Sequence, residues 1–331
     1  MKKGLFFLPF IFSLALSSCA TNKRHDIKEY ILEANYKSNY RILQLTDPHL
    51  ADKDDIETHL KFMDLTIKDA NPDFIVVTGD LFTFSSRTTA KRFFEFLDSY
   101  GVDWTITFGN HDEQCYFSVD WLTSLLNGYS EHCKFKDIQD DDVQGNCNFA
   151  INLMKDSQVF EQLIIMDSNR YYYGSYFGYD YFKDNQIEWY ERLVKHSKDE
   201  YRGGSDVVKS LMFCHIPLPE IYDAWDEAKE GKNGTTLLRG ERREDPCSPD
   251  YNSHFYDTIE RLESTTGIYF GHDHINNFII NFRGKIDFGY GIKSTDRIYY
   301  DEDMMGGRVI VLHDDHSVDY EDIYHTYKEV K

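Results

Sequence analysis

Histidine, carboxylate and amide side chains gather at five places in the chain, and each place follows an apolar run. The clearest are residues 109–112 (Gly-Asn-His-Asp) and residues 271–274 (Gly-His-Asp-His). Such polar side chains need partners that an apolar interior does not provide. Two imidazoles two residues apart, after a strand and a glycine, are a specific arrangement for binding a metal ion. Residues 109–112 alone are equally compatible with a tight polar turn.

Three weaker signals complete the set. Asp47 and His49 lie two residues apart on an extended segment, so their side chains point to the same side and can reach one cation. Asp80 follows Gly79 at the end of a second apolar run, and His215 ends another. Taken singly, each signal is explained as well by a turn that ends a strand.

The order of the elements predicts that the first groups of residues meet. Residues 41–45, 74–77 and 104–108 are expected to be strands, and residues 56–69 and 89–100 carry apolar positions at helical spacing. A β-α-β-α-β order gives neighbouring parallel strands with right-handed crossovers. Five candidate residues would then emerge at one edge of one sheet: Asp47, His49, Asp80, Asn110 and His111.

The rest of the chain predicts further elements in less detail. Strands are expected at 149–153, 160–166, 207–213, 267–270, 278–282, 286–290, 308–312 and 318–323, and helices at 186–194 and 255–262. The last four strands would make a second sheet or complete the first. The aromatic residues 171–181 are expected to cover a sheet edge rather than to stack a substrate. Residues 218–251 are expected to form a long irregular loop whose arginines are solvated.

Length and composition indicate one large folded domain with an acidic surface. The chain has 331 residues, of which 41% are apolar, and no low-complexity linker. Its 36 Lys and Arg against 57 Asp and Glu give a formal net charge of −21. Such a surface repels polyanions, which argues against a nucleic-acid groove but not against a small phosphate ester bound at a locally cationic site. The oligomeric state stays open.

The first residues predict a targeting segment. Lys2 and Lys3 precede an apolar stretch, residues 5–16, which is short for a bilayer-spanning helix. Residues 16–19 (Leu-Ser-Ser-Cys) resemble a bacterial lipobox, which implies cleavage and a lipid on Cys19. An ordinary signal peptide that is cut nearby is the alternative.

These features predict the layout of the chain and its compartment. We expect a lipoprotein-type signal peptide over 1–19, a polar tether over 20–39 and one domain over 40–331. The mature protein is expected outside the cytoplasm, in the periplasm or at the cell surface, and held at the membrane by its lipid anchor.

That compartment permits disulfides. Besides Cys19 the chain has five cysteines: Cys115, Cys133, Cys147, Cys214 and Cys247. The number is odd, so at least one stays free unless it pairs with another chain. Cys214, which follows an apolar run, is expected to be a buried free thiol, and the pairing of the other four stays open.

Taken together, the five segments resemble the calcineurin-like metallophosphoesterases in order and residue type. The resemblance runs from about Arg41 to the C-terminus and is strongest to the compact, purple-acid-phosphatase-like branch, through residues 47–49 (Asp-Pro-His) and residues 271–276. It implies an α/β fold with four layers, α/β/β/α, in which two packed mixed sheets are flanked by helices.

The resemblance also implies a role for each candidate residue. One divalent metal ion would be bound by Asp47, His49 and His274, and a second by Asn110, His215 and His272, with Asp80 bridging the two. Such a pair clamps a phosphoryl group and lowers the pKa of a bridging water, so that a metal-bridging hydroxide attacks the ester. His111 would protonate the leaving group as general acid, and Asp112 would orient it.

One residue departs from the pattern of that branch. Its coloured iron enzymes have a tyrosine three residues after the bridging aspartate, where this chain has Thr83. The iron charge-transfer centre is therefore not expected, and manganese, zinc or iron stay open as the metal.

The sequence thus predicts a metal-dependent phosphatase that hydrolyses small phosphate esters. A phosphomonoesterase is favoured over a phosphodiesterase or a nucleotide-cleaving hydrolase of the same fold, and the natural substrate stays open. A non-catalytic metal-binding surface lipoprotein is the alternative from another class. The presence of all seven candidate ligands together with His111 argues against it.

Overall fold

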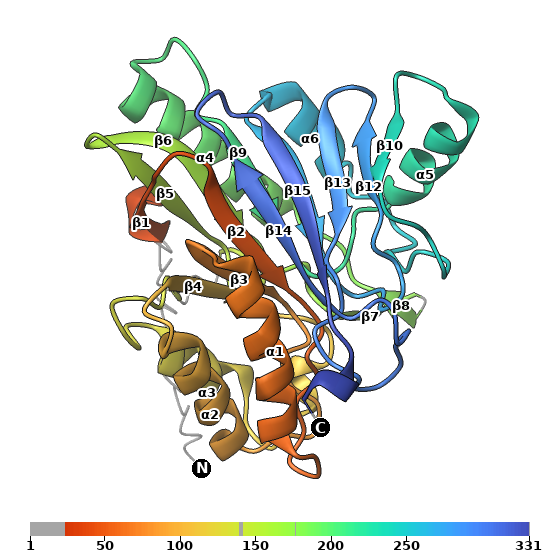
Figure 1. Ribbon diagram of the computed structural model, residues 1–331. Helices are drawn as coiled ribbons and strands as arrows, with labels where there is room; N and C mark the ends of the chain where they lie inside the picture. The colour runs from red at the N-terminus through yellow and green to blue at the C-terminus, as the bar shows by residue number, and fades with distance from the viewer. Residues whose placement is uncertain (1–23, 139–141, 176, 331) are drawn as a thin grey trace, which may run out of the picture.

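Two mixed β-sheets pack against each other in the computed structural model, which describes residues 24–138, 142–175 and 177–330 (Figure 1). Helices lie against the outer faces of the sheets, so the layers run helix, sheet, sheet, helix. The predicted four-layer α/β/β/α fold is confirmed.

The smaller sheet has the strand order β15-β14-β2-β3-β4. Its strands are β2 (Tyr40–Leu45), β3 (Phe74–Thr78), β4 (Asp103–Thr107), β14 (Gly306–Leu312) and β15 (Val318–Tyr324). The first three run parallel, whereas β14 runs antiparallel to β2 and β15 antiparallel to β14. Every residue of β3 is buried, as expected for a continuous apolar run that is covered on both faces.

Helices α1 (Ile56–Ala70) and α2 (Arg87–Asp98) connect the parallel strands, so the predicted β-α-β-α-β unit is confirmed. Helix α1 ends because Asn71 adopts a left-handed backbone, with φ of 42°, and the next residue is a proline. Helix α3 (Val119–Leu126) follows β4, and the Ser118 side chain caps it by accepting a hydrogen bond from the Trp121 backbone.

The larger sheet has the strand order β1-β5-β6-β9-β11-β13-β12-β10. Its strands are β1 (Ile31–Asn35), β5 (Phe149–Lys155), β6 (Gln158–Ile165), β9 (Ser210–Phe213), β10 (Thr236–Arg239), β11 (Thr265–Phe270), β12 (Ile279–Phe282) and β13 (Ile286–Tyr290). Strands β6, β9, β11 and β13 are parallel neighbours. Helices α4 (Asp184–Arg202), α5 (Ile221–Glu230) and α6 (Phe255–Leu262) belong to this half.

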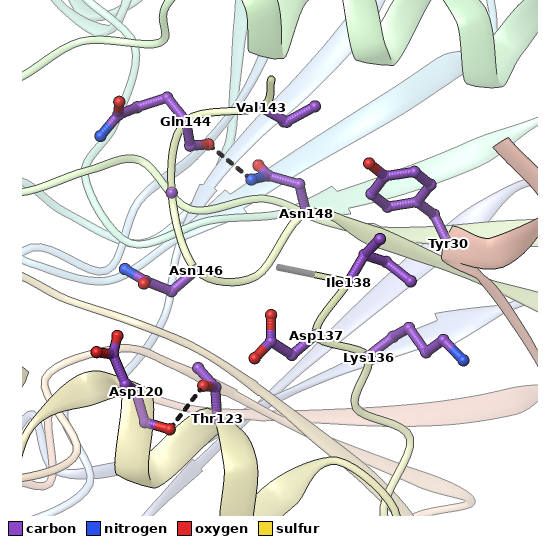
Figure 2. Close-up of a pocket in the computed structure, with 11 residues that line it drawn as sticks. Tyr30, Asp120, Thr123, Lys136, Asp137, Ile138, Val143, Gln144, Asn146 and Asn148 are labelled. Atoms are coloured by element: carbon purple, nitrogen blue, oxygen red, sulfur yellow. Dashed lines mark hydrogen bonds between the residues drawn. The ribbon is translucent and has the colours of Figure 1, made fainter. Parts of the chain in front are cut away.

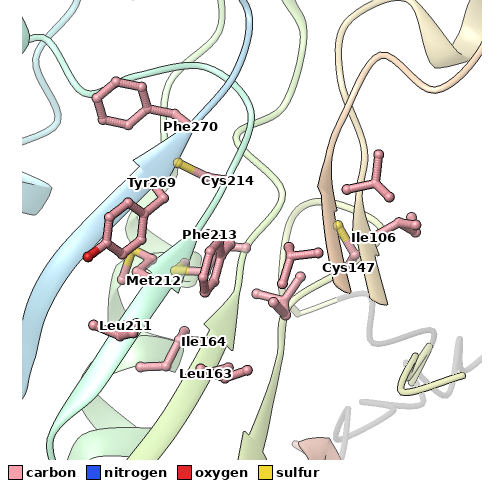
Figure 3. Packing of buried hydrophobic residues seen from close by; sticks show 14 of the residues in the cluster. Ile106, Cys147, Leu163, Ile164, Leu211, Met212, Phe213, Cys214, Tyr269 and Phe270 are labelled. Atoms are coloured by element: carbon pink, nitrogen blue, oxygen red, sulfur yellow. The ribbon is translucent and has the colours of Figure 1, made fainter. Parts of the chain in front are cut away.

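The space between the two sheets holds the main hydrophobic core. Figure 3 shows side chains of β6, β9 and β11, such as Leu163, Phe213 and Tyr269. These three side chains are fully buried, and the Tyr269 hydroxyl lies 2.9 Å from the Tyr320 hydroxyl of β15 in the other sheet. Full burial of such a side chain contributes roughly 1.5–3 kcal/mol, so this layer holds the two sheets in a fixed relation.

Residues 27–35 belong to the fold, and the predicted tether over 20–39 is wrong for them. A short 3₁₀ helix, η1 (Ile27–Tyr30), leads into β1, which pairs in parallel with β5 at the edge of the larger sheet. The Tyr30 ring packs edge-on against Trp189 of α4, with 5.7 Å between ring centroids. The segment is short and its pairing partner lies more than a hundred residues away, so the sequence alone did not indicate that it joins a sheet.

Residues 218–251 also contain regular structure, against the prediction of an irregular loop. They form α5 and β10, and all four residues of β10 are exposed. Their arginines are paired rather than solvated: Arg239 with Asp322, Arg242 with Asp245, and Arg243 with Glu241, Asp301 and Asp303. Some of the pairing carboxylates come from distant segments, so these ion pairs could not be predicted from the sequence.

The predicted signal peptide and Cys19 lie outside the described residues. In the part of the chain that the structure describes, we find no helix with the length and apolar character required to cross a membrane. The five cysteines in that part are free, and Cys214 is fully buried, as predicted. The last four predicted strands divide between the sheets: β12 and β13 extend the larger one, and β14 and β15 complete the smaller one.

Candidate metal centre

The loops that follow five strands bring the predicted metal ligands together. The loops after β2, β3 and β4 carry four of them, and those after β9 and β11 carry the other three. All seven are buried: Asp47, His49, Asp80, Asn110, His215, His272 and His274. The cluster therefore lies where the carboxyl ends of strands from both sheets meet, as expected for an α/β site.

One half of the cluster consists of Asp47, His49, Asp80 and His274, whose ligand atoms lie within 4.8 Å of one another. The Nε2 atoms of His49 and His274 are 3.0 Å apart. Asp47 Oδ1 lies 3.8 Å from the former and 3.5 Å from the latter. Imidazole nitrogens and carboxylate oxygens that converge in this way are the usual ligands of zinc, manganese and iron.

The other half consists of Asp80, His215 and His272, with Asn110 beside them. Asp80 Oδ2 lies 3.3 Å from His215 Nε2 and 3.5 Å from His49 Nε2. Asn110 Oδ1 lies 3.2 Å from His215 Nε2. Because the Asp80 carboxylate is shared by both halves, it occupies the position expected of a bridging ligand.

Hydrogen bonds on the far side of two rings determine which nitrogen faces the cluster. His215 Nδ1 donates to the Thr78 carbonyl and His274 Nδ1 donates to the Tyr299 carbonyl, each over 2.9 Å. A carbonyl only accepts, so the nitrogen that remains for a cation is Nε2 in both rings. Outer partners of this kind fix the tautomer and orientation of metal-binding histidines.

Two atoms of the cluster have no hydrogen-bond partner. Asp47 Oδ2 accepts from the Thr46 hydroxyl at 2.6 Å and from the His272 backbone at 3.0 Å, but Asp47 Oδ1 has no partner, and neither does His272 Nε2. A buried polar group without a partner costs roughly 1–3 kcal/mol. A cation bound in the cluster would satisfy Asp47 Oδ1. His272 instead faces the cluster with Nδ1, which lies 3.3 Å from His215 Nε2. With ligand atoms converging in both halves, the residues present fit a dinuclear metal site.

The charge balance of the cluster supports the same conclusion. Burial alone would raise the pKa of Asp47 and Asp80, but the surrounding imidazoles outweigh it and hold both pKa values below their usual range. Burial and His215 lower the pKa of His272 to about 3. Burial also lowers the pKa of His215, but Asp80 outweighs this and raises it to about 10. Two ionised carboxylates are thus buried among mainly neutral rings, which is an arrangement that favours a divalent cation.

The backbone of the cluster is strained. Four of the seven candidate ligands adopt left-handed conformations: Asp47 (φ 53°), His49 (φ 45°), Asp80 (φ 48°) and His272 (φ 78°). Each costs of order ~1–3 kcal/mol and persists only where the surroundings over-determine it, which is typical of functional sites. Gly79 has φ of 81° and lies against the His215 ring, where any Cβ would collide with the imidazole.

His111 lies at the rim of the cluster and is half-buried. Its ring meets the His49 ring edge-on at 5.1 Å between centroids, and its backbone N–H donates to Asp80 Oδ1 at 2.7 Å. Its Nδ1 lies 2.8 Å from Gln114 Oε1. Because an amide oxygen only accepts, Nδ1 is the protonated nitrogen of the neutral ring when it makes this bond. Gln114, which the sequence did not single out, therefore orients the ring.

Asp112 does not contact the His111 ring, so the prediction that it orients His111 is wrong. Its carboxylate accepts from the backbone of Phe82 at 3.0 Å and of Gly109 at 2.8 Å. Burial and the Asp80 carboxylate raise its pKa to about 8. The side chain ties the loop after β3 to the loop after β4. The reason is local geometry: the 3₁₀ helix η2 (Asp112–Gln114) follows His111, and residues three apart eclipse each other on such a helix.

The aromatic residues 171–181 lie over the cluster, so the prediction that they cover a sheet edge is wrong. Strand β7 (Tyr171–Tyr173) pairs antiparallel with β8 (Phe177–Tyr179). The Tyr171 hydroxyl accepts from Asn110 Nδ2 at 2.8 Å, which leaves Asn110 Oδ1 to face the cluster. The Tyr179 ring packs edge-on against His272 at 4.4 Å. A run of tyrosines is equally compatible with covering a sheet edge and with covering the cluster, so its position could be determined only from the fold.

Two further side chains support the ligands from outside. The Thr83 hydroxyl lies 2.8 Å from His49 Nδ1. Lys293 is buried, and its Nζ donates to the Asp47 carbonyl at 2.8 Å; burial lowers the pKa of this amine to about 8. Thr83 was noted in the sequence only because the coloured iron enzymes have a tyrosine at this position. The role of Lys293 was not predicted, because the Lys293–Asp47 contact joins segments about 250 residues apart.

Comparisons with known proteins agree with this geometry. The family model described as calcineurin-like phosphoesterase matches residues 40–276. Two relatives from Arabidopsis thaliana, named probable inactive purple acid phosphatase 29 and 14, are each 27% identical; they cover 78% and 82% of this chain, over 73% and 74% of their own lengths.

A solved structure shares the fold. The crystal structure of a dimetal phosphatase from Danio rerio is similar over 83% of this chain and 96% of that one, with a TM-score of 0.52 and 14% sequence identity. With the family match over most of its length and a buried His/Asp cluster that suits two metal ions, the chain belongs to the calcineurin-like phosphoesterase family.

Proposed function

We propose that the protein is an active metal-dependent phosphatase that hydrolyses small phosphate esters, with monoesters favoured over diesters. The observation that carries this proposal is the convergence of imidazole nitrogens and carboxylate oxygens in a buried cluster with His111 beside it. A site that only stores metal ions needs no proton donor at its rim. The hydrolytic role is therefore favoured over that of a non-catalytic metal-binding surface protein.

The ligand assignment follows from the two halves of the cluster. One ion is assigned to Asp47, His49 and His274, the other to Asn110, His215 and His272, and Asp80 is assigned to both. When bound, two divalent ions stabilise charge on the phosphoryl oxygens and activate a water for attack. The protein fixes the geometry through the outer partners of the rings.

His111 is assigned the role of general acid. Gln114 Oε1 accepts a hydrogen bond from His111 Nδ1 and so leaves Nε2 as the nitrogen that points away from the η2 turn. The ring lies next to the cluster, beside His49, where a leaving oxygen would depart. Gln114 acts on this step by positioning the ring, and Asp112 acts only by holding the loops together.

The rival function is a metal-binding protein without hydrolytic activity, and two of the relatives are named probable inactive phosphatases. If this chain were also inactive, the manganese-loaded protein would hydrolyse no ester, whatever its metal content. Our proposal expects hydrolysis of both an alkyl phosphate and 4-nitrophenyl phosphate by the same protein. That wild-type measurement is the baseline for the next prediction.

Loss of His111 is expected to matter most where the leaving oxygen is most basic. His111→Asn should lower kcat on an alkyl phosphate roughly 10²–10⁴-fold, because proton donation assists departure of a poor leaving group. The penalty on 4-nitrophenyl phosphate should be much smaller, since that leaving group needs little assistance. Gln114→Ala should follow the same pattern with a smaller loss.

The control is His254→Asn, which changes an exposed histidine that pairs with Asp257 and is not a member of the cluster, and it should alter neither rate. Metal content is measured for every variant. Equal losses on the two esters, together with depleted metal in the His111 variant, would show that His111 supports Asn110 rather than donating a proton.

The Thr83 hydroxyl is expected to hold His49 in its metal-binding orientation. Thr83→Val removes the hydroxyl and keeps the shape, and it should lower metal affinity or activity roughly 10–100-fold. Thr83→Ser keeps a hydroxyl and should retain most of both. Metal titration followed by activity measures the effect, and unchanged affinity in the valine variant would contradict it. The wild type, without a phenolate at this position, should stay colourless when loaded with iron.

We also propose that the mature protein is a lipoprotein, anchored through Cys19 on the extracytoplasmic side of the membrane. The support is the basic start, the short apolar stretch and the Leu-Ser-Ser-Cys sequence at residues 16–19. The protein should sediment with membranes, and Cys19→Ser should release it or block its maturation. Mass spectrometry that finds an unmodified N-terminus at another residue would contradict the anchor.

A further inference from the structure

A cavity of about 780 Å³ lies beside the cluster, between the loop after β4, the start of α3 and the loop after β6. Its wall includes Gly109, Glu113 and Tyr171. Gly109 precedes Asn110 in the chain, Glu113 lies two residues after His111, and the Tyr171 hydroxyl accepts a hydrogen bond from Asn110. An ester whose phosphate lies at the cluster can therefore extend its alcohol into this cavity.

One wall of the cavity is aromatic. It is formed by Phe117, Tyr171 and Tyr173. The first is buried, whereas Tyr173 is 78% exposed, and the Tyr171 and Tyr173 rings lie 6.2 Å apart. Exposed aromatic rings at the mouth of a cavity are a surface against which the C–H face of a sugar ring packs.

The polar wall of the cavity is mainly acidic. It carries four carboxylates and one guanidinium: Glu113, Asp120, Asp167, Asp180 and Arg170. Arg170 is already paired with Glu113, and Asp180 with Lys183. Asp167 is buried and already accepts hydrogen bonds from Asn146 and Asn169, so the exposed Asp120 is the carboxylate left to accept hydrogen bonds from ligand hydroxyl groups. The carboxylates together repel a second negative charge on a ligand.

The cavity continues past its carboxamide groups. Asp120, Gln144 and Asn146 also line a neighbouring cavity of about 510 Å³. Figure 2 shows Asp120 on α3 together with Gln144 and Asn146 on the loop before β5. Carboxamides both donate and accept, so they match hydroxyl groups, which do the same. The volume lies within the range of pockets for medium-sized organic ligands.

We propose that this cavity binds the alcohol part of a phosphorylated carbohydrate, an uncharged polyhydroxylated group of mono- or disaccharide size. The inference rests on the proposed phosphatase function and names its substrate class. The aromatic wall receives the ring, and Asp120 and the carboxamides receive its hydroxyls. A further phosphate or carboxylate on the alcohol is disfavoured by charge, and a short alcohol leaves most of the volume unfilled.

The test compares matched esters on the manganese-reconstituted protein. Sorbitol 6-phosphate and gluconate 6-phosphate differ only in that one end carries a hydroxyl or a carboxylate. Methyl glucoside 6-phosphate adds the ring, and glycerol 3-phosphate lacks most of the hydroxyls. We expect kcat/KM to be about tenfold or more higher for sorbitol 6-phosphate than for gluconate 6-phosphate. We expect a difference of the same size between methyl glucoside 6-phosphate and glycerol 3-phosphate, with the glucoside ester preferred.

Two variants test whether the cavity causes these differences in kcat/KM. Tyr173→Ala removes an exposed ring, and Asp120→Asn removes an exposed carboxylate. The first should lower kcat/KM for the glucoside ester several-fold more than for the glycerol ester. The second should reduce the discrimination against gluconate 6-phosphate. Tyr116→Ala, which removes a ring that is 72% exposed and lies outside the cavity wall, is the matched control and should leave both ratios unchanged.

The outcomes separate the two proposals. Hydrolysis of all four esters with equal kcat/KM would overturn the carbohydrate subsite and leave the phosphatase function standing. A preference for the acidic or the shortest ester would overturn it as well. Absence of hydrolysis of every ester in the metal-loaded protein would overturn the phosphatase function, and the subsite with it.

Discussion

The structure depends on the burial of two ionised carboxylates, Asp47 and Asp80, among imidazole rings in one cluster. Two rings keep Nε2 for the cluster, because backbone carbonyls hold their Nδ1 protons. Asp47 Oδ1 is left without a hydrogen-bond partner. Unpaired buried charge of this kind is costly unless a cation compensates it. The metal site is therefore a consequence of the electrostatics of the fold and not merely of its residue types.

The packing of the two sheets stabilises this arrangement of buried charges and strained loops. The ligands lie on loops after β2, β3, β4, β9 and β11, and several have left-handed backbones. Hydrogen bonds between these loops fix them, such as His272 N to Asp47 Oδ2 and His111 N to Asp80 Oδ1. The core between the sheets holds the loops at a constant separation. Strain at the site is thus compensated by packing elsewhere.

Much of the fold and the cluster could be predicted from the sequence, because it rests on local patterns. Helix α1 and strand β3 follow from periodicity and continuous apolar runs, and the ligands follow strand ends in the order of a known family. The contributions of Lys293 and of the β7–β8 strand pair could not be predicted, since each depends on contacts between distant segments. The role of Gln114 is local, but it depends on the 3₁₀ helix η2, which was not predicted from the sequence. Asp112 was misassigned because neighbours in sequence point apart on a 3₁₀ turn.

The central claim is that the cluster binds two metal ions that hydrolysis requires, with Asp80 shared between them. Metal content and hydrolysis of a phosphomonoester should be measured together on the wild type, on Asp80→Asn and on Asp223→Asn, an exposed carboxylate on α5. The account predicts about two ions per chain and full activity for the wild type and the control. It predicts loss of one or both ions, with loss of activity, for Asp80→Asn. Full hydrolysis by a chelator-treated wild type that holds no metal would contradict it.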